Sequence, residues 1–143
     1  MNRLVLLGTG CPAPSHKRFG PSTLIEINGE RYLFDTGSGV TQRLNELGLK
    51  SSDIDLVFIT HIHSDHIVDL YQLYISGWHQ GRNKPFKIIG PVGIKHFFTK
   101  QLESYFDELK LRKEYELRPN EVGLDYEIIE IDDDFKFANK NLS

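Results

Sequence analysis

The feature that most constrains this chain is a cluster of potential metal ligands at His61, His63, Asp65 and His66. The cluster directly follows a short apolar run at residues 56–59, which predicts a buried strand, and it precedes apolar residues at helical spacing. Side chains two positions apart on a strand point to the same side, so His61 and His63 face one cleft. A turn after this pair can bring Asp65 and His66 to the same cleft, beyond the carboxyl end of the strand, where open α/β sheets bind ligands.

The donor types in this cluster suit zinc. Three imidazoles and one carboxylate fit zinc better than magnesium, because magnesium prefers an all-oxygen shell. The alternative is that these histidines are ordinary polar surface residues, as histidines at exposed strand ends often are. Four ligand-type residues at the end of one buried strand favour the metal site. We therefore predict that His61, His63, Asp65 and His66 bind zinc.

Length and composition limit the number of domains, the possible partners and the cellular compartment. A length of 143 residues with 39% hydrophobic residues predicts one domain with its own core. The net charge of -3 argues against a general polyanion binder, so a nucleic-acid substrate would need a local basic patch. The single Cys11 excludes an internal disulfide and a cysteine-based zinc cluster, and it fits a reducing compartment. The apolar residues 4–7 are too few for a signal peptide, and no stretch is long enough to cross a membrane. These features predict a cytoplasmic protein with no membrane partner.

The order of predicted elements indicates the fold class. Apolar runs and two-residue alternation predict strands at residues 3–7 (buried), 22–27, 31–34, 56–59, 86–89 and 126–131. Helical spacing predicts helices at residues 40–47, 67–78 and 92–109, the last with an aromatic stripe that faces the core. Residues 135–137 would begin a further strand. Strands followed by alternating helices and strands predict an α/β layered domain with a mixed sheet.

A long loop at residues 8–21 carries His16, Lys17 and Arg18 in its middle. A loop of this length inside a compact domain is usually functional or mobile. The three side chains are either a solvated loop tip, as loops often are, or a contact to an anionic substrate.

The His-x-His-x-Asp-His arrangement resembles the signature of the metallo-β-lactamase superfamily. The resemblance extends to Asp35-Thr36-Gly37 after a predicted strand and to Gly8-Thr9-Gly10 with two prolines near the start. Together with Phe19-Gly20-Pro21-Ser22, that early motif is more similar to the ribonuclease Z branch, with its phosphodiesterase and arylsulfatase-like relatives, than to the lactamases.

This resemblance implies a site with two zinc ions, the first held by His61 and His63 and the second by Asp65 and His66. A hydroxide between the metals would attack a phosphodiester, with RNA as a candidate substrate, or a related ester, and Asp65 would also act in proton transfer. Asp35 would brace the loop behind the ligands. The alternative interpretation of Asp35 is a turn-forming residue with no contact to the site, since Asp is common in such turns.

The chain departs from the family pattern in its second half. The later ligands of the family, a histidine, a bridging aspartate and a final histidine, have no match, which leaves two protein ligands per zinc where catalytic sites typically use three. We therefore expect residues 1–143 to be a single truncated domain, the N-terminal half of a four-layer αββα sandwich. Such a half would leave an apolar sheet face uncovered, so we expect self-association, for instance as a homodimer, and weak or no metal binding.

Two alternatives remain open. Asp35-Thr36-Gly37 also resembles the active-site turn of aspartic proteases, which need two such carboxylates and hence, here, a homodimer. That alternative leaves the histidine cluster unexplained. The other is a catalytically inactive fragment or interaction domain that kept the fold and lost the chemistry, as the missing ligands suggest.

Overall fold

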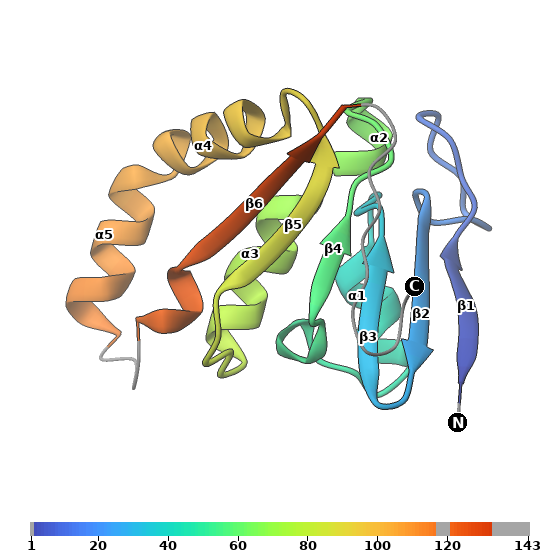
Figure 1. Ribbon diagram of the computed structural model, residues 1–143, viewed down its shortest axis with the longest axis horizontal. Coiled ribbons are helices and arrows are strands. Elements are labelled where there is room, and N and C mark those ends of the chain that lie inside the picture. Colours follow the sequence, from blue (N-terminus) through green and yellow to red (C-terminus); the bar gives the residue numbers. More distant parts are fainter. Residues whose placement is uncertain (1, 117–120, 133–143) are drawn as a thin grey trace.

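Six strands form one mixed sheet in the computed structural model of the chain, which describes residues 2–116 and 121–132 (Figure 1). The strands lie in sequence order and are β1 Arg3–Gly8, β2 Ser22–Ile27, β3 Glu30–Phe34, β4 Leu56–Phe58, β5 Phe86–Pro91 and β6 Tyr126–Ile131. The pairs β1–β2 and β2–β3 are antiparallel, whereas β3–β4, β4–β5 and β5–β6 are parallel. The predicted α/β class with a mixed sheet is confirmed.

The hairpin between β2 and β3 follows from two residues. Asn28 and Gly29 both have positive φ, at 51° and 88°, which a two-residue hairpin of this kind requires and which this residue pair adopts easily. The turn fixes the register of β2 on β3, with Thr23 opposite Phe34 at the far end. The hairpin therefore places Asp35 directly after the carboxyl end of β3, which points upward in Figure 1.

The helices cover one face of this sheet. They are α1 Val40–Glu46, α2 Ser64–Ile67, α3 Leu70–His79, α4 Ile94–Ser104 and α5 Phe106–Tyr115, with short 3-10 turns η1 Ser51–Asp53 and η2 Val122–Leu124. Figure 1 shows α1 and α3 behind the sheet, and the main core fills the space between them and the strands. Its fully buried members include Leu24, Leu33, Leu44, Val57, Leu70, Leu73, Ile94 and Phe98. Within residues 2–116 and 121–132, no helix combines the length and apolar composition needed to cross a bilayer.

The opposite face of the sheet is also apolar, but no described helix lies on it. A second cluster there contains Tyr32, Leu56 and Ile89, with Ile25, Phe34, Phe58 and Ile131 packed against it. The Phe34 and Phe58 rings are stacked, with centroids 4.7 Å apart and an interplanar angle of 12°. Apolar residues therefore alternate onto both faces, the pattern of a sheet that is covered on both sides.

The first strand differs from its prediction. Residues 3–7 form a strand, but only Leu7 is buried, at 3% exposure, while Leu4 is 61% and Leu6 is 59% exposed. The reason is position, because β1 is an edge strand and these two leucines alternate onto the face that carries no described helix. Hydrophobicity alone predicted burial, whereas the place of a strand in the sheet decides it.

Two predicted helices were also wrong in extent. The helix predicted at residues 92–109 ends at Ser104 and restarts at Phe106, because Tyr105 leaves the helical region with φ −103° and ψ 15°. The aromatic stripe therefore splits, with Phe98 fully buried and Phe106 65% exposed. The helix predicted at residues 67–78 begins only at Leu70, after the separate short helix α2. The strand predicted at residues 135–137 lies outside the described residues.

Candidate metal centre

The parallel pairing of β3 and β4 brings the candidate residues to one edge of the sheet. Phe34 pairs with Phe58, so the residues that follow each strand emerge side by side. Asp35 N–H donates to the Phe58 carbonyl at 2.8 Å, and Asp35 lies beside Thr60, just before the histidines. The cluster predicted from His61 to His66 thus begins at the carboxyl end of β4 and continues into α2 (Figure 1).

Asp35 is buried, with 6% exposure, and its carboxylate faces the cluster. Its Oδ1 accepts from Thr60 N–H at 2.8 Å, and its Oδ2 accepts from the Thr60 hydroxyl at 2.8 Å and from His66 Nδ1 at 2.8 Å. The backbone of Asp35 is left-handed, with φ 61°, a conformation that Asp tolerates better than most residues. Asp35 is therefore more than a turn residue, because its side chain orients His66 and the start of the cluster.

The hydrogen bonds assign the tautomers of two imidazoles. Because the Asp35 carboxylate only accepts, His66 must carry its proton on Nδ1, which leaves the Nε2 lone pair free in the neutral ring. Thr60 Oγ1 gives its single proton to Asp35 and lies 3.0 Å from His61 Nδ1, so His61 Nδ1 donates to it. In their neutral form, both rings thus present an unprotonated Nε2, the state that binds a metal.

The predicted ligands lie together. The His61 ring centroid is 4.0 Å from that of His66 and 4.7 Å from that of His63. Asp65 Oδ2 is 3.7 Å from His66 Nε2, beyond hydrogen-bond distance. The structure therefore gathers all four predicted ligands around one end of the sheet.

These donors fit zinc in chemistry but not in number. Histidine nitrogens with a carboxylate partner behind them are typical zinc ligands. However, nowhere in residues 2–116 and 121–132 do three His, Cys, Asp or Glu side chains form a group that could hold one metal ion.

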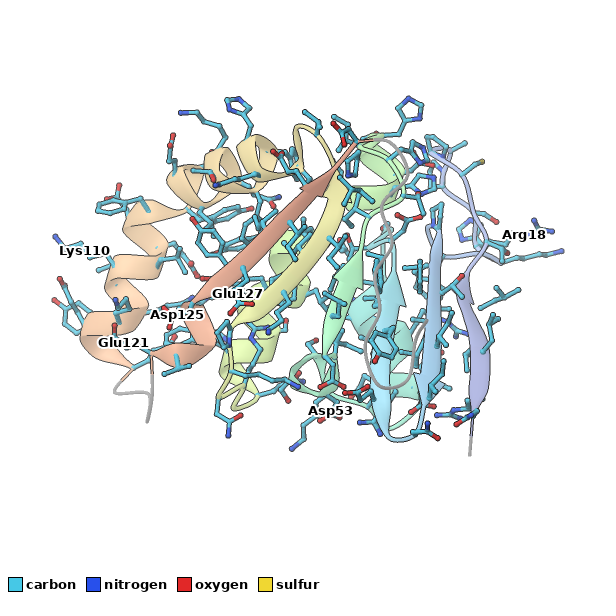
Figure 2. The ribbon with its side chains drawn as sticks, in the orientation of Figure 1. Arg18, Asp53, Lys110, Glu121, Asp125 and Glu127 are labelled. Carbon is cyan, nitrogen blue, oxygen red and sulfur yellow. The ribbon has the colours of Figure 1, made fainter. Side chains whose placement is uncertain are left out.

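The loop at residues 8–21 forms a cavity of about 380 Å³ against the cluster. The cavity is lined by Asp65, Ser64 and Val68 on one side and by loop residues such as Phe19 and Arg18 on the other. Arg18 also lines a second cavity of about 210 Å³, together with His16 and Lys17. Figure 2 shows Arg18 at the outer edge of the molecule, beside β1. Of the three predicted substrate contacts, only Arg18 borders the cavity that contains Asp65.

Sequence patterns missed two residues that shape this site. Thr60 links Asp35 to His61, and its only signal was a hydroxyl immediately before the cluster. Arg43 holds the base of the loop, because its Nε donates to the Leu7 carbonyl at 2.9 Å and its guanidinium lies 5.3 Å from the Phe19 ring centroid. Arg43 sits on a helix face that sequence periodicity marks only as polar.

A family profile described as "Anti-Pycsar protein Apyc1" matches residues 2–131, which is most of the chain. The chain belongs to the Anti-Pycsar protein Apyc1 family. Ribonuclease Z of Mycolicibacterium gilvum is 37% identical over 115 residues, which are 78% of this chain and 40% of that protein. The short form of human tRNase Z has a similar structure, with a TM-score of 0.66 and 35% identity over 74% of this chain and 40% of that one.

The fold of this Apyc1 family member is that of the metallo-β-lactamase superfamily. The metallo-beta-lactamase fold protein YhfI from Bacillus subtilis matches 96% of this chain and 48% of that one, with a TM-score of 0.69 and 18% identity. The resemblance to the ribonuclease Z branch is confirmed, and the chain spans about 40% of the length of the curated relatives that it matches. The aspartic protease alternative stays a prediction, and the Asp35 carboxylate that it would use is buried and bonded to Thr60 and His66.

Proposed function

We propose that this chain supplies the N-terminal part of a zinc-dependent hydrolase that cleaves phosphodiester bonds, in the manner of ribonuclease Z. One observation carries the proposal: His61 and His66 are both held as tautomers with a free Nε2, by Thr60 and Asp35. Such hydrogen bonds behind imidazole ligands are typical of metal sites. Relatives named ribonuclease Z support the reaction class.

In this proposal the clustered residues bind metal and transfer a proton. His61 and His63 would hold one zinc ion, and Asp65 and His66 a second. When bound, zinc would supply Lewis acidity that activates a water molecule and polarises the phosphoryl oxygens. The Asp65 carboxylate, which borders the cavity, would take the proton of the attacking water and return it to the leaving oxygen. Further ligands would come from residues outside the described part, since that part holds no complete group.

The substrate would be an anionic phosphodiester, which RNA exemplifies. Arg18 borders both the cavity beside Asp65 and the cavity that contains His16 and Lys17. A phosphate chain that leaves the cluster along Arg18 would next meet these two side chains. The proposal therefore assigns His16, Lys17 and Arg18 to substrate contact.

Self-association belongs to the same proposal. The sheet face of Tyr32, Phe34 and Phe58 is apolar and carries no described helix. Tyr32 itself is buried, but Leu4 and Leu6 on the same face are 61% and 59% exposed, so another sheet is its natural cover. We propose that the isolated chain associates through this face. The cytoplasmic location predicted from the sequence stays a prediction.

Hydrolysis of bis(p-nitrophenyl) phosphate with added zinc tests the function. We compare this chain with a version extended at its C-terminus by the corresponding part of a ribonuclease Z relative. The extended protein is expected to hydrolyse the substrate, and Asp65→Asn is expected to slow it by between about 10² and 10⁴-fold, the size of a general acid–base contribution. Asp107→Asn, in the exposed first turn of α5, is the matched control and is expected to change nothing. An inactive extended protein, or an unaffected Asp65→Asn variant, would contradict the proposal.

A non-catalytic interaction domain is the second candidate. The absence of a three-ligand group in residues 2–116 and 121–132 favours it for this chain. The same assay decides, because this candidate expects no zinc-dependent hydrolysis from the extended protein.

A further inference from the structure

Helix α1 begins without a capping side chain of its own. Its N-cap residue is Gly39, with φ 85°, and no side chain caps this end from that position. A Cβ at Gly39 would lie 2.1 Å from a ring atom of Phe19, so no larger residue fits there. The first N–H groups of a helix still need acceptors, and these must come from elsewhere in the fold.

Asp69 supplies the acceptor. Its Oδ2 accepts from Gly39 N–H at 2.7 Å, and its carboxylate also accepts from Val40 N–H. Asp69 occupies the N-cap position of α3, yet its side chain makes no capping bond to that helix. Burial raises the pKa of the Asp69 carboxyl, and the bonds from Gly39 and Val40 oppose this shift. The Asp69 side chain therefore caps the N-terminus of α1, thirty positions earlier in the chain, rather than that of α3.

The backbone of Asp69 joins the same turn. Asp69 N–H donates to the Thr36 carbonyl at 3.0 Å, and Thr36 N–H donates to the His66 carbonyl at 2.7 Å. Next to Thr36 in the chain, Asp35 accepts a hydrogen bond from His66 Nδ1 through its Oδ2, at 2.8 Å. The turn at residues 35–39 and the segment at residues 66–69 are therefore fastened at several points, and the Asp69 carboxylate is the fastening at one end.

We propose that Asp69 is a positioning residue for the histidine cluster. By capping α1 it holds the turn at residues 35–39 against α2, so that Asp35 reaches His66 and fixes its tautomer. Asp69 touches neither the cluster nor the cavity beside Asp65, and it acts through Asp35. The importance of this role for catalysis rests on the proposed function, whereas the placement of His66 does not.

Nuclear magnetic resonance of the metal-free chain tests this proposal. The readouts are the His66 Nδ1–H signal, the ring nitrogen shifts that report its tautomer, and amide exchange at Thr36 and Gly39. In Asp69→Ala we expect the Nδ1–H signal to be lost, the tautomers to mix, and both amides to exchange at least about tenfold faster. Asp69→Asn keeps an acceptor oxygen and is expected to restore the wild-type signals.

Asp53→Ala is the matched control. Its carboxylate also accepts a backbone N–H, from Lys50 at 2.9 Å, but it lies at the opposite end of the sheet from α2 (Figures 1 and 2). It is expected to leave the His66 signals unchanged. If Asp69→Ala does not fold, Asp69→Glu takes its place, since the longer side chain misplaces the carboxylate and is expected to disturb His66. Unchanged His66 signals in Asp69→Ala, or in Asp69→Glu if that variant replaces it, would overturn the proposal. A disturbance of the His66 signals in Asp69→Asn as large as that in Asp69→Ala would also overturn it. Because no metal or substrate is present, a failed hydrolysis assay would leave this result standing.

Discussion

Replacing Arg82 by alanine is expected to lower the free energy of unfolding by about 4 kcal/mol, because it removes a large buried side chain and its hydrogen bonds to two carbonyls. Arg82 is 2% exposed, and its Nη2 donates to the carbonyls of Tyr74 and Gly123, each at 2.7 Å. Its guanidinium carbon lies 4.7 Å from the Phe86 ring centroid. The side chain therefore ties α3 to β5 and to η2, which leads into β6.

One further variant separates the contributions at this position. Among the described residues, Arg82 Nη1 has no hydrogen-bond partner, so part of the buried charge is uncompensated. Burial accordingly lowers the pKa of the guanidinium, which stays cationic at neutral pH. Arg82→Met keeps much of the volume and removes this charge, so we expect it to cost less than Arg82→Ala. Urea unfolding measures all three proteins, and an alanine variant within 1 kcal/mol of wild type, on the order of a single hydrogen bond, would contradict the account.

Replacing Asp35 by alanine is expected to lower the free energy of unfolding by about 3 kcal/mol. The change leaves donors on Thr60 and His66 without an acceptor, and it puts alanine at a positive φ that alanine adopts poorly. In the C-terminally extended protein, zinc affinity is expected to fall by between about 10- and 100-fold, as it does when the partner of a metal-bound histidine is lost.

Asp35→Asn is the companion variant. Asparagine tolerates the left-handed backbone and keeps one acceptor oxygen, so it should recover most of the unfolding free energy. An amide NH₂ in place of the wild-type Oδ2 cannot accept from the Thr60 hydroxyl or from His66 Nδ1, so zinc affinity should stay reduced. Urea unfolding of the chain and zinc titration of the extended protein provide the two measurements. An alanine variant with wild-type zinc affinity would show that Asp35 does not orient His66.

Local patterns in the sequence were sufficient for most of the elements and for the position of the cluster. The Asn28-Gly29 pair specified its hairpin, and the spacing of His61 and His63 after an apolar run predicted that their rings lie close together. These features depend on a few neighbouring residues, which is why they can be recognised in the sequence. The contact of Asp35 with the cluster was expected only through family resemblance, because thirty-one positions separate it from His66.

Features that depend on distant residues could not be predicted. Arg82 lies in a stretch rich in glycine and charged residues, which is typical of a loop, yet it is buried because Gly77 leaves room for its Nη1. Phe106 was expected in the core, but the break at Tyr105 turns it to solvent. Asp69 caps a helix far away in the sequence, and no local pattern signals such a bond.

The central claim is that residues 61–66 form part of a zinc site that other residues complete. Elemental analysis after equilibrium dialysis against zinc, with the molar mass from light scattering, tests it most directly on this chain and on its extended version. The account predicts that the isolated chain self-associates and holds zinc weakly, while the extended protein retains two ions per chain, as a two-metal hydrolase site requires. A monomeric isolated chain that binds zinc tightly and stoichiometrically, or an extended protein that retains none, would contradict it.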